Sequence, residues 1–252
     1  MVIYTITSGK GGVGKTTSAV NLGAAINKFK EEVIIVDANL STPNIGLHFG
    51  APIVPVNLNH ALQGKADIQE AIYEHESGTK IVPSSLSLKD LKKINIYSLK
   101  DVMKELKPIS QHIILDSAAG LGEEARAAIE AADEIIIVTN PNILAVTDSL
   151  KAIKLAEELK KPVRGVILTR VKNVRTEMPL SNIREMLEVP IIGLVPEDKH
   201  IEQALVNKNA VIHTKPKSKS SKAYMDIAAK LLGKKKKPES LLNRILDKLG
   251  LG

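Results

Sequence analysis

The chain has 252 residues, of which 44% are hydrophobic and only 2% aromatic, so it can bury one large core built from aliphatic side chains. It contains no cysteine, which excludes a disulfide framework, thiolate metal sites and cysteine-ligated iron–sulfur clusters. The formal net charge is +7, with many lysines after residue 214, which suggests an anionic partner, either lipid or nucleic acid. A solvated, solubilising tail is the alternative.

Short buried strands alternate with helical patterns along most of the chain. The first strand, Val2–Ser8, runs into a glycine-rich loop, Gly9–Gly14, and then into a helix over Lys15–Phe29. Alternation of this kind predicts an α/β fold, a single three-layer α/β/α domain with a mostly parallel sheet, in which ligands lie beyond the carboxyl ends of the strands. Further strands are predicted at Val33–Asp37, Thr79–Val82, Ile113–Asp116, Glu134–Thr139, Val163–Thr169 and Ile191–Val195, and helices at about 97–107, 122–131, 143–160 and 180–187.

The end of the chain changes in composition. Thr214–Lys222 is rich in Lys, Ser and Pro and is predicted to be an exposed loop, followed by a last helix over Ala223–Leu232. We therefore expect one folded domain over residues 1–232, a basic linker over 233–238, and a separate short element over 239–252.

The loop after the first strand carries the clearest motif. Gly9–Thr16 fits G-x-x-x-x-G-K-[ST] between a predicted strand and a predicted helix, as a phosphate-binding loop requires. Glycines let the backbone approach phosphate, and the loop and helix N–H groups donate to it. Lys15 would charge-pair with the β and γ phosphates, and Thr16 would bind Mg²⁺. A glycine-rich turn that matches by chance is the alternative. The predicted phosphate contacts are Gly11, Gly12, Val13, Gly14, Lys15 and Thr16.

A second lysine refines the motif. Lys10 near the start of the loop, with Gly11-Gly12 and the doubled Thr16-Thr17, resembles the deviant Walker A box of the MinD/ParA family of P-loop NTPases (the SIMIBI type of fold). The resemblance implies ATP and Mg²⁺ as cofactors. It also implies an ATP-dependent homodimer, in which Lys10 reaches the partner's phosphates, and a contact from Thr17 to the α-phosphate.

Two aspartates, Asp37 and Asp116, lie at the ends of predicted strands. The segment Val36–Asn39 resembles the family's switch I, and Ile114–Gly120 resembles its D-x-P-A-G switch II. Both would lie near the phosphate loop, where with Thr16 they could hold Mg²⁺, through water in the case of the aspartates. A helix cap or a salt bridge is the alternative for each.

The switch segments also depart from the family pattern. Switch I usually reads D-x-D, and its second Asp helps position the attacking water, but Asn39 stands here. An amide is a poor base, so we expect a slow ATPase with a long-lived ATP state. Ala118 replaces the switch II proline. The predicted catalytic residues are Lys10, Lys15, Asn39 and Asp116.

The adenine site is indicated only by the resemblance. Relatives often carry Asn-Arg at the end of a later strand, where Thr169 precedes Arg170 here. The remaining predicted contacts are Arg170 itself and the loop formed by Pro196, Glu197 and Asp198. No guanine-type N-K-x-D motif is evident, so ATP is favoured by the family pattern.

The last segment has an amphipathic pattern. Treated as a helix, Glu239–Leu249 gathers its apolar residues in an arc of roughly 140° behind the lysine run 234–237. It resembles the C-terminal membrane-targeting helix of MinD-like proteins, which implies binding to an anionic membrane surface. A helix docked on its own domain or on a protein partner is the alternative. The apolar residues are Leu241, Leu242, Ile245, Leu246 and Leu249.

These patterns lead to one preferred function and two alternatives. We expect a MinD-like ATPase that dimerises with ATP, binds the membrane reversibly and positions other proteins, with an unknown protein activator or cargo. No signal peptide or span of ~20 apolar residues is visible, so the expected location is cytoplasmic, peripheral at the inner face of the cell membrane. The alternatives are a ParA-like partition ATPase that binds DNA through its basic region, and a regulator that binds ATP but barely hydrolyses it.

Overall fold

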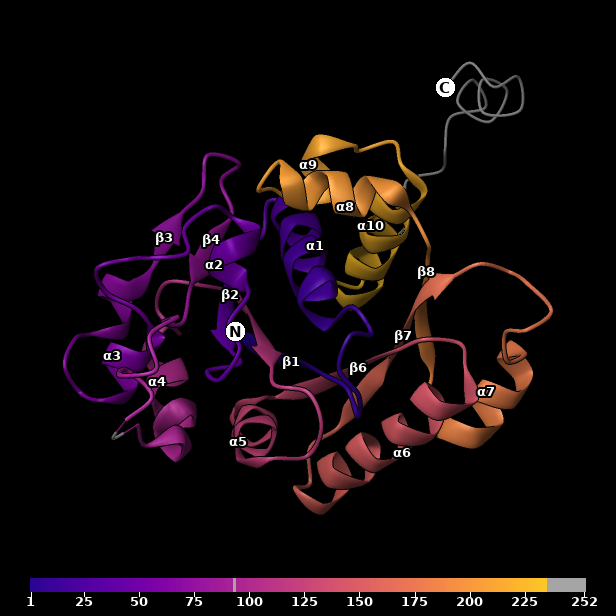
Figure 1. Cartoon of the computed structure of the whole chain (residues 1–252), viewed down its shortest axis with the longest axis horizontal. Coiled ribbons are helices and arrows are strands. Elements are labelled where there is room, and N and C mark those ends of the chain that lie inside the picture. The colour runs from indigo at the N-terminus through magenta and orange to yellow at the C-terminus, as the bar shows by residue number, and fades with distance from the viewer. Residues whose placement is uncertain (93, 235–252) are drawn as a thin grey trace.

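The computed structural model describes residues 1–92 and 94–234, and within them a sheet of eight strands forms the centre of the molecule (Figure 1). The strand order is β3-β4-β2-β5-β1-β6-β7-β8, and every pair is parallel except β3 with β4. The predicted fold class is therefore confirmed. The strands are β1 (Val2–Thr7), β2 (Val33–Ala38), β3 (Tyr73–Glu74), β4 (Lys80–Val82), β5 (His112–Ser117), β6 (Glu134–Thr139), β7 (Val163–Val171) and β8 (Ile191–Pro196).

Helices cover both faces of the sheet. In Figure 1, α1, α8, α9 and α10 lie on one side, and α5, α6 and α7 on the other. The helices are α1 (Lys15–Lys28), α2 (Ile45–His48), α3 (Leu58–Leu62), α4 (Leu99–Glu105), α5 (Glu123–Ala131), α6 (Ile143–Glu158), α7 (Leu180–Leu187), α8 (Lys199–Val206), α9 (Val211–Thr214) and α10 (Lys219–Leu231), with 3-10 helices at Ile68–Ala71 and Ile96–Ser98.

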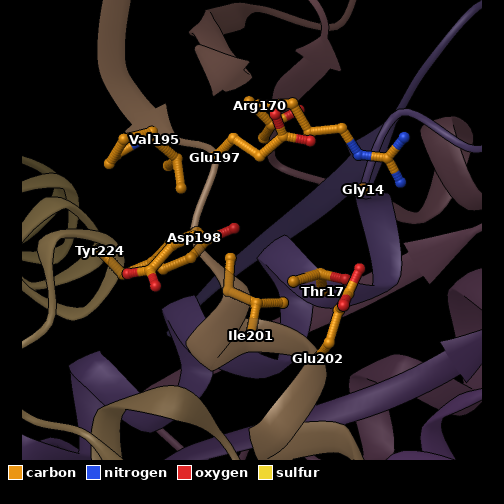
Figure 2. A pocket seen from close by; sticks show the side chains of 11 residues that line it. Gly14, Thr17, Arg170, Val195, Glu197, Asp198, Ile201, Glu202 and Tyr224 are labelled. Atoms are coloured by element: carbon orange, nitrogen blue, oxygen red, sulfur yellow. The ribbon is translucent and has the colours of Figure 1, made fainter. Parts of the chain in front are cut away.

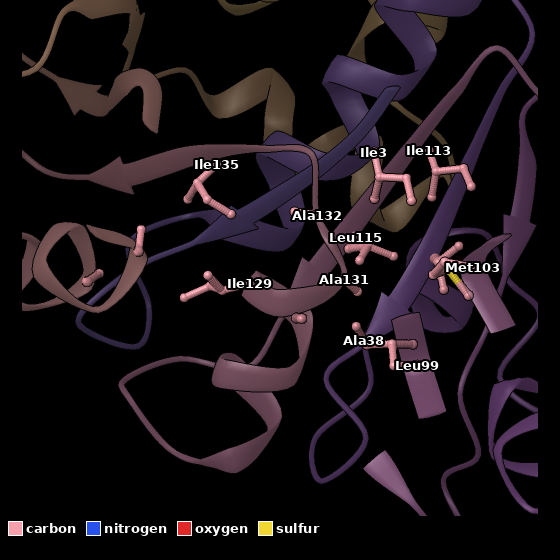
Figure 3. Close-up of a cluster of buried hydrophobic side chains, with 14 of the residues drawn as sticks. Ile3, Ala38, Leu99, Met103, Ile113, Leu115, Ile129, Ala131, Ala132 and Ile135 are labelled. Atoms are coloured by element: carbon pink, nitrogen blue, oxygen red, sulfur yellow. The ribbon is translucent and has the colours of Figure 1, made fainter. Parts of the chain in front are cut away.

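The core is divided by the sheet into two aliphatic layers, because successive strand residues point to opposite faces. Ile34 and Val36 of β2 pack in one layer, whereas Val33 and Ile35 pack in the other. Figure 3 shows part of the first layer, where isoleucine and leucine side chains of β1 and β5 meet α4 and α5. Burial of each such side chain stabilises the fold by about 2 kcal/mol. This packing holds in place the strands whose carboxyl ends form the site.

One predicted segment is wrong. The polar stretch 214–222 is only partly a loop, because α10 begins at Lys219 and both Ser220 and Ser221 are buried. The hydroxyl of Ser221 donates to the carbonyl of Val211 at 2.9 Å, and Ser218 accepts the N–H of Ser221 as the N-cap. Serine hydroxyls that are satisfied within the fold carry this segment into the interior, against its composition.

The last described residues remain attached to the domain. After α10, Gly233 adopts a φ of 64°, and the ammonium of Lys234 pairs with Glu31 at 2.6 Å and lies 5.4 Å from the centre of the Phe29 ring. The start of the predicted linker 233–238 is thus held against α1 and the turn after it. Residues 235–238 and the predicted helix at Glu239–Leu249, with its five apolar residues, lie outside the described residues. Within residues 1–92 and 94–234, no helix is long and apolar enough to cross a membrane.

Candidate nucleotide-binding site

The glycine-rich loop joins β1 to α1 with its donors unused. Gly12 and Gly14 have φ values of 77° and 93°, a conformation that side chains disfavour. The Gly14 carbonyl accepts the N–H of Ser18 at 2.9 Å and so starts the helix. No backbone N–H from Gly11 to Thr17 donates a hydrogen bond to another described residue. A loop of free N–H groups at a helix N-terminus is a site for an anion.

The first glycine of the motif has a different role. A Cβ on Gly9 would lie 1.9 Å from the backbone oxygen of Asp148 in α6. Gly9 is therefore required for the close approach of the loop to α6, and not for a positive φ.

The two lysines of the motif differ in exposure. Lys15 is 8% exposed, and burial lowers its pKa while the charge of Asp116 raises it. Lys10 is exposed, and no described residue forms an ion pair with it. Lys15 is therefore buried within the site, whereas Lys10 is exposed and has no ion-pair partner among the described residues.

The two predicted switch aspartates lie side by side. Asp37 and Asp116 are register partners at the carboxyl ends of β2 and β5, and both are fully buried. Burial raises both pKa values, and for Asp37 the neighbouring Asp116 adds to the effect. The Asp37 carboxylate accepts the N–H groups of Asn44 and Ile45, each at 2.8 Å. It therefore shapes the start of α2, in addition to the metal role predicted for it.

Asp116 retains unused capacity. Its Oδ2 accepts the hydroxyl of Thr16 at 2.6 Å, and its Oδ1 is buried with no partner among the described residues. A buried oxygen without a partner is costly unless a ligand completes it. Oxygen donors are the ligands that Mg²⁺ prefers, usually with water between ion and carboxylate. Thr16 and Asp116 fit such an ion, and their predicted metal role stays a proposal.

Asn39 is held by its own loop. Its Nδ2 donates to the carbonyl of Thr42 at 2.7 Å, and its Oδ1 accepts the Thr42 hydroxyl at 3.0 Å. The next residue but one, Ser41, donates its N–H to the carboxylate of Glu124 at 3.2 Å. Asn39, at the position where relatives carry an acid, therefore stabilises the switch I loop through Thr42. The hydrogen bond from Ser41 to Glu124, which connects switch I to α5, was not predicted from the sequence.

Two adjoining cavities lie over the loop. One is the phosphate cavity, bordered by the glycine loop, the switch I segment and Ala119. The other is the base cavity, formed where the ends of β7 and β8 meet α1, α8 and α10. They share Gly14, Thr17 and Arg170, so one elongated ligand could occupy both. Figure 2 shows the Arg170 side chain extending toward Gly14. The base cavity is lined by Gly14, Thr17, Thr169, Arg170, Val195, Pro196, Glu197, Asp198, Ile201, Glu202 and Tyr224.

The predicted base contacts line that cavity but differ in availability. Asp198 accepts the N–H of His200 at 3.0 Å and the hydroxyl of Ser220 at 2.8 Å, and these hydrogen bonds hold its pKa down at about 2, although burial raises it. The Glu197 carboxylate pairs with Lys172, and both side chains are about half exposed. Asp198 therefore supports the cavity wall, which leaves Pro196, Glu197 and Arg170 as the freer groups.

Sequence analysis missed the lining residues that come from the helices α8 and α10. Ile201 and Glu202 come from α8, and Tyr224 comes from α10. The Tyr224 hydroxyl lies 3.1 Å from the hydroxyl of Ser18 in α1, which ties α10 to the helix that follows the loop. No local motif marks these positions, because they reach the cavity only through helix packing.

A parallel sheet with a glycine loop after its first strand, a buried lysine and paired acidic strand ends defines a P-loop nucleoside triphosphatase. Residues 4–211 match the model of the CobQ/CobB/MinD/ParA nucleotide binding domain. The chain is 39% identical to an uncharacterised ATP-binding protein of Methanocaldococcus jannaschii, over 98% of this chain and 96% of that protein.

Two solved structures agree with this result. The cell division ATPase MinD of Pyrococcus furiosus superposes with a TM-score of 0.88 at 30% identity, over 92% of this chain and 98% of that one. The septum site-determining protein MinD of Pyrococcus horikoshii, complexed with Mg-ADP, gives 0.87 at 30% identity, over 97% and 98%. The chain belongs to the MinD/ParA family of nucleotide-binding domains, as its loop and switch segments predicted.

Proposed function

We propose that the chain is an Mg²⁺-dependent ATPase whose nucleotide state controls self-association and reversible membrane binding, and that it thereby positions other proteins. The observation that carries the nucleotide part is that, among the described residues, the buried Asp116 Oδ1 has no partner and the backbone N–H groups from Gly11 to Thr17 have no acceptor. A site with a purely structural role would leave neither a buried carboxylate oxygen nor a row of loop N–H groups without hydrogen-bond partners. Release of phosphate from ATP by the purified chain, lost without Mg²⁺, is the expected result. A chain that binds no nucleotide would contradict it.

Each residue has a definable task in that reaction. The loop N–H groups and Lys15 bind the phosphates and stabilise the charge that develops on them. Thr16 and Asp116 would hold Mg²⁺, which neutralises phosphate charge when it is bound. Arg170 and the Pro196–Glu197 segment would border the sugar and base. Burial of Lys15 strengthens its interaction with phosphate, since competing water is removed.

Slow turnover follows from the arrangement of Asn39. Its amide is engaged with Thr42 at both ends, so it offers water no negative charge and only the remaining lone pair of a weakly basic oxygen. N39D is expected to raise the turnover number by roughly tenfold, measured as phosphate release at saturating ATP. Control reactions use N182D, which changes an exposed amide in α7 that lines neither cavity. An unchanged or lower rate for N39D would show that Asn39 is not the brake.

ATP-dependent self-association is supported by Lys10. Lys10 is exposed and precedes Gly11, which lines the phosphate cavity, and no described residue forms an ion pair with it. We expect a monomer with ADP and a dimer with ATP by light scattering, and loss of the dimer in K10A. K28A, which removes an exposed lysine from α1, should still dimerise. A K10A chain that dimerises with ATP would contradict this role.

Membrane binding is supported by the tail sequence, in which a basic run precedes an apolar arc. One short helix binds weakly, so a dimer that presents two would bind by avidity. Full-length chain should pellet with anionic vesicles in ATP, and the 1–236 truncation should not. Equal pelleting of both chains would end the anchor proposal. Salt-sensitive binding to plasmid DNA without vesicle binding would favour the partition function.

A further inference from the structure

Thr169 joins the end of β7 to the phosphate loop. The side chain is 4% exposed, and its Oγ1 donates to the backbone carbonyl of Val13 at 2.5 Å. The same oxygen accepts the Nδ2 of Asn140 at 2.9 Å. A hydroxyl has one proton to donate. The second possible acceptor, the carbonyl of Thr139, is farther away at 3.2 Å. The Val13 carbonyl therefore receives the proton.

This bond fixes the direction of a particular N–H group. A trans peptide is planar, so the N–H of Gly14 points away from the Val13 carbonyl that it follows. Thr169 holds that carbonyl toward β7, which turns the Gly14 N–H away from β7 and toward the loop's own cavity. Gly14 can follow because its φ of 93° carries no side-chain penalty. Gly14 also lies close to the Thr169 side chain, since a Cβ on Gly14 would lie 3.6 Å from Thr169 Oγ1.

The hydroxyl consequently has no proton left to donate to a base. Its proton is committed to Val13, and one lone pair is committed to Asn140. Thr169 lines the base cavity, yet the only polar atom of its side chain is turned to the loop. A strand-end residue in this cavity thus serves the phosphate side of the site.

We propose that Thr169 is the positioning residue of the phosphate site. Its hydroxyl orients the Val13–Gly14 peptide so that the Gly14 N–H donates to a phosphate oxygen, and it takes no part in choosing the base. The proposal rests on the proposed function, since it assumes that a nucleotide phosphate occupies the loop.

The test compares two buried threonines. T169V removes the hydroxyl with little change of shape, and T169S keeps it. T5V is the matched control, because Thr5 Oγ1 donates to the carbonyl of Ala128 at 2.6 Å, is equally buried and lies outside both cavities. Calorimetry with ADP and with inorganic pyrophosphate should show about tenfold weaker binding of both to T169V, the size expected for one misplaced hydrogen bond to a charged group. T169S should bind within about threefold of the wild type, and T5V should bind like the wild type.

The outcomes separate this proposal from the proposed function. A wild-type chain that binds no ADP would overturn the proposed function and the role of Thr169 with it. A wild type that binds ADP, with T169V binding ADP and pyrophosphate equally well, would overturn only the positioning role. A changed preference between ADP and GDP in T169V, with pyrophosphate binding intact, would show that Thr169 reads the base, and would also overturn it. Melting temperatures identify a misfolded T169V, in which case T169A provides the second hydroxyl-free variant.

Discussion

Asp116, which accepts the Thr16 hydroxyl behind the phosphate loop, and Asp198 at the base cavity are both largely enclosed, yet their pKa values are displaced in opposite directions. Burial raises the pKa of Asp116, and Oδ1 has no partner among the described residues. Asp198 accepts hydrogen bonds from His200 and Ser220, and its pKa falls to about 2. The fold satisfies one carboxylate and leaves the other incomplete. The difference distinguishes a carboxylate that supports the wall of a site from one prepared for a ligand.

The largest expected effect belongs to the phosphate side. K15A removes the buried charge of the loop, so turnover should fall by about 100-fold or more, the size found when one preorganised stabilising group is lost. Phosphate release at saturating ATP measures this loss, and K28A on the same helix should keep the wild-type rate. Turnover of K15A near that of wild type would place the chemistry elsewhere.

At the base cavity, substitution of the wall carboxylate Asp198 should mainly change the stability of the fold. D198A leaves Ser220 and the start of α8 without their acceptor, which should lower the free energy of unfolding by about 3 kcal/mol. Its neighbour provides the control, because E197A breaks only an exposed pair with Lys172, worth less than about 1 kcal/mol. Urea denaturation of both variants measures the difference. Similar midpoints would show that Asp198 does not hold the wall.

The contribution of the Asp198 carboxylate should also appear in the acid dependence of stability. The folded pKa of Asp198 lies near 2, below its ordinary value of 3.8, so the folded state holds that proton less tightly than the unfolded state. Its contribution to stability is present above pH 3.8 and is lost as the pH falls through about 2. The loss amounts to about 2 kcal/mol. D198N should lack this part of the acid dependence, and an unchanged acid profile in D198N would contradict the low pKa.

Asp116 should show the opposite sign. Its pKa is raised in the folded state, so its contribution to stability is present below pH 3.8 and is lost as the pH rises through the folded pKa. In the nucleotide-free chain at pH 8, D116N should therefore raise the free energy of unfolding by about 1 kcal/mol. The variant should also lose activity, since stability gained at a ligand site costs function. A less stable D116N would mean that the carboxylate is structural.

Much of the phosphate side could be predicted from the sequence, because its parts are local. The loop, Lys15 and Thr16 are contiguous, and Asp37 and Asp116 each follow an unmistakable buried strand. The second lysine and the switch segments indicated the family. These elements lie together because parallel strands end at one edge of the sheet.

The base side could not be predicted in the same way. Thr169 acts on Val13, 156 residues away, and was visible in the sequence only as a departure from the family pattern. The segment 214–222 was wrongly expected to be an exposed loop, because the partners of Ser220 and Ser221, Asp198 and Val211, are distant along the chain or belong to an unpredicted helix. Polar residues that are satisfied by tertiary hydrogen bonds leave no periodic pattern to detect.

The central claim is that the free N–H groups between β1 and α1 hold nucleotide phosphates. Isothermal titration of ADP into the wild-type chain, with and without Mg²⁺, tests it most directly. We predict one ADP bound per chain, more tightly with Mg²⁺ than without, and displaced by pyrophosphate. A chain that binds no ADP under either condition, or one whose ADP pyrophosphate cannot displace, would contradict the account.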